Sequence, residues 1–258
     1  MTSDSIVPVS FDAYEADFEG FAQALGDSFS RYGFAVIGDH PLEQARIEGT
    51  LAAAKAFFAL PEEAKRAYVG GQRGYTAFGV ETAKGEAHHD LKEFWHMGRD
   101  LPEGHPYAPV MPPNVWPADV PGFREEVSWL YGALDAMGLK VLEALAVYLG
   151  LERHFFAPTV DHGNSVLRLL HYPPTSGEGP HIRAAAHEDI NVITLLLGAE
   201  EAGLEVLRRD GSWLAINPPA GSLVCNIGDM LQRLTNHRLP STTHRVVNPA
   251  PERRGVAR

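Results

Sequence analysis

The sequence is poor in cysteine, in basic residues and in long apolar runs. Its single cysteine, Cys225, excludes an intramolecular disulfide and fits a reducing compartment. No apolar run approaches the roughly 20 residues that a membrane-spanning helix needs. The amino-terminal stretch has neither the basic nor the apolar segment of a signal peptide. We therefore expect a cytoplasmic protein with no membrane partner.

Acidic residues outnumber basic ones, 33 against 22, which gives a formal net charge of −11. A surface of that sign repels phosphate backbones, so we expect no nucleic acid partner. Hydrophobic residues make up 45% of the 258, an ordinary share for a globular protein long enough to bury a sizeable core. The sequence has no internal repeat, and its composition assigns no oligomeric state.

The first half of the chain has mainly helical periodicity, with short strands between the helices. Residues 18–32 carry apolar side chains at helical spacing, and Gly33 follows as a stop. A short run around Pro8, residues 6–11, is typical of an edge strand. The other expected elements are a buried strand, an Ala-rich helix and a long amphipathic helix, at 34–37, 51–60 and 123–151. The proline-rich residues 101–121 predict a connecting loop.

After Gly163 the pattern changes to short β-branched segments separated by turn-forming residues. Such segments predict an all-β sandwich or barrel. The expected strands are 165–171, 190–197, 203–208, 213–216, 222–226 and 243–247. We therefore expect a mixed α/β region, a linker with its long helix, and a β core, at residues 1–100, 101–164 and 165–258.

With 12 histidines in the chain, two His-x-Asp triplets are about what chance allows, so context must choose between them. His88–His89–Asp90 lies in a charge-rich, helix-like stretch, AKGEAHHDLKEFWHMG, where a solvated polar segment is the better interpretation. His187–Glu188–Asp189 lies at the mouth of the expected strand 190–197. Residues two apart on an extended segment face the same side, so His187 and Asp189 can converge on one ion while Glu188 points away.

A third ligand is available at His244, in the expected strand 243–247. Two imidazoles and one carboxylate on one side of an ion leave three positions open, the arrangement associated with iron(II) oxygenases. The same donors also suit zinc, so a zinc hydrolase stays open at this point, as does a non-catalytic metal-binding protein. We predict a metal site formed by His187, Asp189 and His244.

An ordered series of motifs runs along essentially the whole chain. IVPVSF, SRYGFAVIGDH and AKAFFALPEEAKRAY come first, and RGYTAFG and DLKEFW follow. The later motifs are LRLLHYPP, AAAHEDINVITLLL, LVCNIGDMLQRLTN and STTHRVVNP. In order and spacing they resemble the isopenicillin N synthase-like branch of the 2-oxoglutarate and iron(II)-dependent oxygenases. The resemblance implies an α+β fold with a double-stranded β-helix (jelly-roll) core, a helical amino-terminal region and a long supporting helix.

The resemblance also implies an activity and its cofactors. It indicates a dioxygenase that holds Fe(II) at His187, Asp189 and His244 and uses O₂, with 2-oxoglutarate as co-substrate and ascorbate as an activator. Oxidation of a small-molecule substrate, usually hydroxylation, would accompany formation of succinate and CO₂. The family's members act on many kinds of small molecule, and the motifs do not name the substrate.

In that family an arginine beyond the second histidine ligand pairs with the distal carboxylate of 2-oxoglutarate, a bidentate contact that suits a guanidinium. Arg254 and Arg258 are both candidates, and we prefer Arg258 because it would begin a strand after the turn-like NPAPERRG. Tyr172 in HYPP matches the tyrosine that hydrogen-bonds the same carboxylate. Leu170 stands where relatives often have asparagine.

The family pattern would continue beyond Arg258 with a serine that completes a core strand, so we expect the sequence to be truncated. One alternative stays within the fold, because isopenicillin N synthase itself uses no 2-oxoglutarate; an oxidase or cyclase of that type is open. The aromatic residues Tyr75, Phe78, Phe94 and Trp95 either line a substrate pocket or belong to the core.

Overall fold

The computed structural model describes residues 5–80, 92–173, 183–198 and 203–247, and it divides into two compact units. The first unit combines Met1–Pro41, Lys140–Phe155 and Ile182–Arg258, and the second combines Leu42–Leu139 and Phe156–His181. The division into regions 1–100, 101–164 and 165–258 that the sequence suggests stays a prediction.

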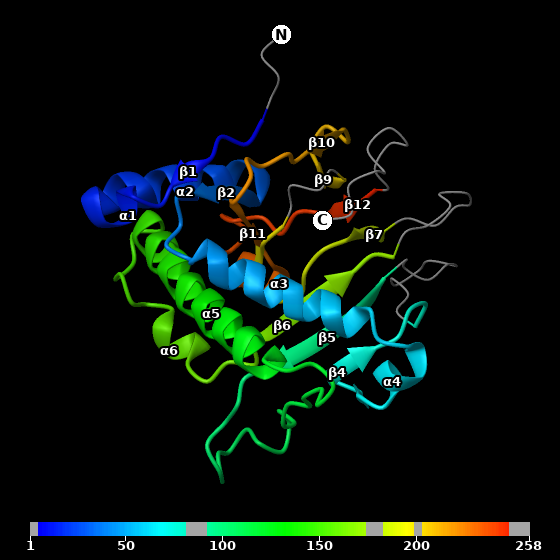
Figure 1. Ribbon diagram of the computed structural model, residues 1–258. Helices are drawn as coiled ribbons and strands as arrows, with labels where there is room; N and C mark the ends of the chain where they lie inside the picture. The colour runs from blue at the N-terminus through cyan, green and yellow to red at the C-terminus, as the bar shows by residue number, and fades with distance from the viewer. Residues whose placement is uncertain (1–4, 81–91, 174–182, 199–202, 248–258) are drawn as a thin grey trace. The chain divides into compact units, whose positions relative to one another are not determined.

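The first unit contains two four-stranded sheets (Figure 1). One sheet has the order β1 (Val9–Ser10), β2 (Phe34–Gly38), β11 (Leu223–Ile227), β8 (Ile193–Leu196). The other has the order β10 (Trp213–Ala215), β9 (Leu204–Leu207), β12 (His244–Val246), β7 (Ala184–His187). Apolar side chains of both sheets form one buried cluster: Phe34, Val36, Leu204, Val206, Ile216 and Val224. The two sheets therefore share a core, as in a sandwich.

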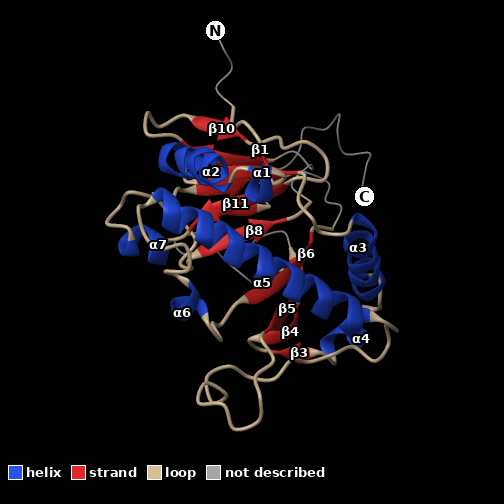
Figure 2. Cartoon of the chain, turned by 90° about the vertical axis from the view of Figure 1, so that its left-hand side faces the viewer, coloured by secondary structure: helices blue, strands red, loops and turns tan. Residues whose placement is uncertain are grey.

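Helix α2 (Phe18–Tyr32) belongs to the same unit and lies against its first sheet (Figure 2). It buries one apolar stripe, which includes Phe21, Leu25 and Phe29, as its helical spacing predicts. The Asp17 side chain caps the start by accepting a hydrogen bond from the Gly20 amide. Gly33 ends the helix with φ of 70°, in the left-handed region that favours glycine. Two further helices, α1 (Ala13–Ala16) and α7 (Asp229–Leu234), complete the described part of this unit.

The second unit is built on one four-stranded antiparallel sheet: β3 (Val69–Gly70), β4 (Arg73–Thr76), β5 (Glu93–Gly98) and β6 (Val166–His171). Its helices are α3 (Gln44–Phe58), α4 (Glu62–Arg66) and α6 (Ala157–Val160), and α5 (Phe123–Tyr148) begins in it. The core of this unit gathers around the fully buried Trp95, with Phe57 and Phe123 at ring-centroid distances of 4.8 and 5.0 Å. Tyr75 and Phe94 are buried as well, so these aromatics belong to the core, whereas Phe78 is 40% exposed.

Most of the expected elements are present, with shifted ends. The helix expected at 18–32 is observed at those bounds, and residues 99–122 contain neither helix nor strand. The Ala-rich helix starts earlier than expected, at Gln44, and ends at Phe58. The long helix ends at Tyr148 rather than 151, because Gly150 takes a φ of 77°. No helix among the described residues has both the length and the hydropathy needed to cross a bilayer.

One expectation about the stretch AKGEAHHDLKEFWHMG is wrong. Its second part is not helix-like, because Glu93–Gly98 forms β5 between β4 and β6. Charged residues at one end of the stretch hide an alternation in which Trp95 and Met97 face the core. His88, His89 and Asp90 lie outside the described residues.

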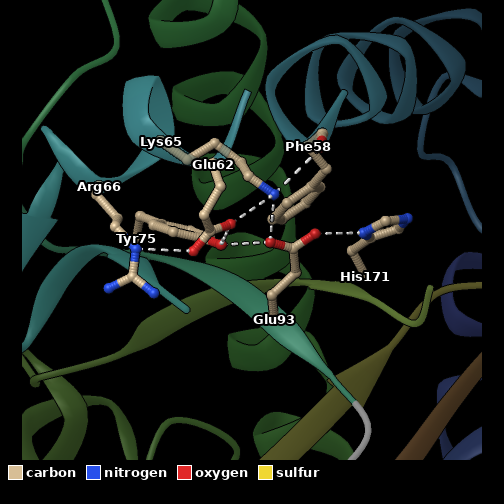
Figure 3. A network of polar contacts seen from close by, with 7 residues as sticks. All are labelled: Phe58, Glu62, Lys65, Arg66, Tyr75, Glu93 and His171. Atoms are coloured by element: carbon tan, nitrogen blue, oxygen red, sulfur yellow. Dashed lines mark hydrogen bonds and ion pairs between the residues drawn. The ribbon is translucent and has the colours of Figure 1, made fainter. Parts of the chain in front are cut away.

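A buried carboxylate at Glu93 connects β5 to three other elements of the second unit (Figure 3). Its Oε2 accepts hydrogen bonds from the Tyr75 hydroxyl and from Lys65 Nζ, the latter at 2.7 Å. Its Oε1 faces His171 Nδ1, also at 2.7 Å. Burial alone would raise the pKa of Glu93, but the hydrogen bonds from His171, Lys65 and Tyr75 lower it to about 2. Glu93 is therefore an anion held in place by its donors.

We expect Glu93→Gln to lower the free energy of unfolding near pH 7 by about 3 kcal/mol, because it removes the buried charged partner of Lys65 and leaves that ammonium group with the half-exposed Glu62, 3.4 Å away. Since the folded-state pKa lies below the ordinary value of 4.5, the contribution of Glu93 is present above about pH 4.5 and is lost as the pH falls toward 2. Calorimetry should show that the melting temperatures of wild type and variant converge across that window. Glu103→Gln, at an exposed position, is the matched control. A difference in melting temperature between wild type and Glu93→Gln that does not change with pH would contradict the view that Glu93 is an anion in the folded protein.

Candidate metal centre

The two predicted histidine ligands are partners in the register of the antiparallel strands β7 and β12, which Figure 1 labels. His187 is the last residue of β7 and pairs in register with His244, the first residue of β12. Their ring centroids are 4.4 Å apart. Phe34 on β2 makes an edge-on contact with the His244 ring at 5.3 Å, which fixes the orientation of that imidazole. Strand pairing thus brings together two residues that are distant in the sequence.

The carboxylate of Asp189 completes the group. Its Oδ1 lies 3.8 Å from His187 Nε2 and 3.9 Å from His244 Nε2. All three donor atoms lie within 4.8 Å of one another, the only such cluster of possible metal ligands in the part of the chain that the structure describes. Side-chain exposure rises from 10% at His244 to 21% at Asp189 and 42% at His187, so the cluster is open on the side of His187.

Both histidines have the tautomer that a metal ligand needs. His187 Nδ1 lies 2.7 Å from the Ala185 carbonyl, and His244 Nδ1 lies 3.1 Å from the Thr242 carbonyl. A carbonyl oxygen can only accept, so each Nδ1 carries the hydrogen and donates it. The Nε2 lone pair of each neutral ring is then free for a cation, and it faces Asp189.

One oxygen of Asp189 is occupied and the other is free. Oδ2 accepts hydrogen bonds from Thr194 Oγ1 at 2.5 Å and from Asn226 Nδ2 at 2.8 Å. Thr194 Oγ1 in turn accepts from Asn191 Nδ2 at 2.9 Å, which leaves the hydroxyl hydrogen for the carboxylate. Oδ1 remains for a metal, so the contacts favour coordination through a single oxygen.

The backbone around Asp189 is also fixed. The Asp229 amide at the start of α7 donates to the Asp189 carbonyl at 2.7 Å. Gly228, just before it, lies so close to the loop that an added Cβ would stand 2.1 Å from the Asn191 carbonyl oxygen. Only glycine can accept this approach, so Gly228 is required for the position of the ligand loop.

The charges of the cluster match those of a cation site. Burial would raise the pKa of Asp189, but the hydrogen bonds from Asn226 and Thr194 and the neighbouring histidines hold it below its ordinary value. Burial, with the neighbouring His187, lowers the pKa of His244, which favours its neutral form. An ionised carboxylate beside two imidazoles is the donor set that Fe(II) or a similar divalent ion accepts.

The local setting of the ligands differs from the expectation in one respect. The strand expected at 190–197 is shorter, Ile193–Leu196, and His187 does not lie at its mouth. His187 instead ends a separate strand, β7, which the sequence did not predict, and Asp189 follows in the loop. Glu188 accepts a hydrogen bond from Thr243 Oγ1 at 2.7 Å and is not part of the cluster.

The structure describes one of the three residues predicted to bind 2-oxoglutarate. Tyr172 directly follows β6 in the second unit and is partly buried. Arg254 and Arg258 lie outside the described residues. The sequence interpretation missed Thr194 and Asn226. A polar asparagine inside the apolar segment LVCNI was the available sign, because a buried amide needs a partner.

Two protein-family models match this chain. Residues 7–119 match the amino-terminal region described as non-haem dioxygenase in morphine synthesis, and residues 163–257 match the 2OG-Fe(II) oxygenase superfamily. Among curated proteins, the chain is 36% identical to proline hydroxylase buaE of Petromyces alliaceus, over 90% of this chain and 76% of that protein. It is 35% identical to the 2-oxoglutarate-Fe(II) type oxidoreductase hxnY of Emericella nidulans, over 90% of this chain and 71% of that protein.

The solved structures that resemble this chain include a member of the same superfamily. A 2OG-Fe(II) oxygenase family protein from Caulobacter crescentus is 67% identical, with a TM-score of 0.92, over 97% of this chain and 83% of that one. A full-length protein of Neurospora crassa, solved in complex with alpha-KG, is 32% identical, with a TM-score of 0.84, over 95% of this chain and 79% of that one.

The chain therefore belongs to the 2OG-Fe(II) oxygenase superfamily. It has the double-stranded β-helix core of that superfamily and is a dioxygenase dependent on Fe(II), 2-oxoglutarate and O₂. The comparisons do not favour a cyclase that works without 2-oxoglutarate, or a non-catalytic metal-binding protein.

We expect Thr194→Val to weaken metal binding about tenfold, because Asp189 loses one of the two donors that fix its carboxylate. Anaerobic calorimetric titration with Fe(II) measures the change. Thr243→Val is the matched control, since that hydroxyl binds Glu188 and not a predicted ligand. Equal affinities of wild type and Thr194→Val would contradict the role given to the Thr194 hydroxyl.

Proposed function

We propose that His187, Asp189 and His244 hold the Fe(II) of this dioxygenase. One observation carries the assignment: the second polar atom of each side chain is already hydrogen-bonded to protein, and the remaining three donors converge. Three protein ligands on one side leave room for a co-substrate and for O₂. When bound, the iron supplies O₂ activation coupled to the conversion of 2-oxoglutarate to succinate and CO₂.

For 2-oxoglutarate we propose two residues of this chain. Arg258 would pair with the distal carboxylate through its planar guanidinium, and the Tyr172 hydroxyl would donate to the same group. Support comes from the positions of both residues in motifs that resemble the family, HYPP before the metal motif and the segment after STTHRVVNP. The chain's own residues thus bind and orient the co-substrate.

The substrate that we propose is a small organic molecule, which the enzyme oxidises by hydroxylation. Related proteins support a compact polar substrate: one is named a proline hydroxylase, and the Neurospora crassa protein has been solved with thymine. The net charge of −11 disfavours a nucleic acid substrate. The single, buried Cys225 fits a cytoplasmic location.

We expect His187→Ala, and equally Asp189→Ala, to abolish succinate formation, because each removes one of three protein ligands. The assay follows succinate produced from 2-oxoglutarate with Fe(II) and ascorbate, alongside anaerobic Fe(II) binding. His154→Ala, at a side chain that is 71% exposed, should behave as wild type. Wild-type protein without turnover, together with unchanged iron binding in His187→Ala, would rule the proposal out.

The two arginines near the carboxyl end provide a matched comparison. We expect Arg258→Lys to raise the KM for 2-oxoglutarate at least tenfold, because an ammonium group cannot reproduce a bidentate contact with the distal carboxylate. Arg254→Lys should leave that KM unchanged. The reverse pattern in steady-state kinetics would assign the carboxylate to Arg254 instead.

A further inference from the structure

The last residue of β6, His171, lies beside the buried Glu93 in the second unit (Figure 3). The two residues are direct partners in the antiparallel register of β5 and β6. His171 Nδ1 lies 2.7 Å from Glu93 Oε1, and since the carboxylate is ionised, the imidazole donates. This end of β6 is therefore held by the contact between His171 and Glu93 as well as by the backbone pairing of β6 with β5.

The His171 ring is held on a second side. It stacks on Phe58, at the end of α3, with centroids 5.0 Å apart and an interplanar angle of 18°. Glu93 cannot turn away, because Lys65 and Tyr75 occupy its other oxygen. The Glu93 side chain is 4% exposed, whereas that of His171 is 37% exposed. A planar contact and a hydrogen bond to a fixed anion together leave His171 one orientation.

The alternation of side chains along β6 relates the contact of His171 with Glu93 to Tyr172, the next residue in the chain. Leu169, two residues before His171, is buried in the core cluster around Trp95, whereas Leu170 is 39% exposed. Successive side chains of a strand point to opposite faces, so His171 lies on the same face as Leu169, and Tyr172 is the first residue after the strand. The core-side contact fixes the backbone from which Tyr172 projects.

We propose that His171, anchored by Glu93, is a positioning residue that sets the place of Tyr172 for binding the carboxylate of 2-oxoglutarate. This inference rests on the proposed function of Tyr172. His171 itself touches Glu93 and Phe58, and acts on the co-substrate only through the backbone of its neighbour. Removing the hydrogen bond should therefore weaken 2-oxoglutarate binding without weakening iron binding.

The experiment is an anaerobic titration of the iron(II) protein with 2-oxoglutarate, followed by the metal-to-ligand charge-transfer band. His171→Phe keeps a ring on Phe58 but removes the donor, and we expect it to raise the Kd about tenfold. His171→Asn carries an N–H one bond from Cγ, where Nδ1 stands, and should restore a Kd near that of wild type. Iron(II) affinity should be unchanged in both variants.

His154→Leu is the control, since this exposed histidine also pairs with a glutamate, Glu143, at 3.3 Å, but in the first unit. Its Kd should equal that of wild type. If His171→Phe does not fold, His171→Leu, which also lacks the donor, is titrated in its place with the same expectation. A wild-type iron(II) protein that binds no 2-oxoglutarate would end the proposed function and the inference together. Wild-type binding with an unchanged Kd in His171→Phe would end the inference alone.

Discussion

The pairing of β7 with β12 is the constraint on which the metal site depends. This register sets His187 opposite His244, and it places Asp189 two residues beyond the end of β7. A shift by one residue would turn every side chain of one strand to the opposite face and separate the two imidazoles. The register is fixed from the other side as well, because β12 also pairs with β9, where His244 stands opposite the buried Val206. Burial of Val206 on β9 thus helps to hold β12 in the register that sets the geometry of the cluster.

The buried Glu93 and the partly exposed Asp189 show how protein surroundings separate a structural anion from a candidate metal ligand. Both oxygens of Glu93 are bound by donors, among them the cation Lys65, so its charge is balanced within the protein. Asp189 has donors on Oδ2 only, and these are neutral. Its Oδ1 lies 3.8 and 3.9 Å from the Nε2 atoms of His187 and His244, so these three donors can share one cation. This convergence of donors is the physical reason for expecting a metal there.

The sequence predicted which residues form the cluster better than it predicted the strands that carry them. His187, Asp189 and His244 could be selected because His-x-Asp spacing and a distal histidine restrict the choice, and the family motifs added weight. Strand β7 was missed because Ala184–Ala186 has little strand propensity and is extended only through pairing with β12. The residues of β5 were assigned to a helix-like stretch because charged residues precede them. In the structure the buried Glu93 has hydrogen-bond partners on α4, β4 and β6. The sequence did not assign Thr194 and Asn226 as donors to Asp189, because only the pairing of the strands brings these side chains to the carboxylate.

Strand β6 shows why the proposed co-substrate residue Tyr172 is harder to interpret than the candidate metal ligands. Its alternation gives Leu169 and His171 to the core face, where their contacts are determined by packing and by Glu93. Leu170 belongs to the other face, and it is the position where the motif that LRLLHYPP resembles would lead us to expect asparagine. An exposed leucine offers apolar surface and no hydrogen bond there. The difference at Leu170 therefore falls on the exposed face of β6, two residues before Tyr172, whereas Leu169 and His171 are held on the core face.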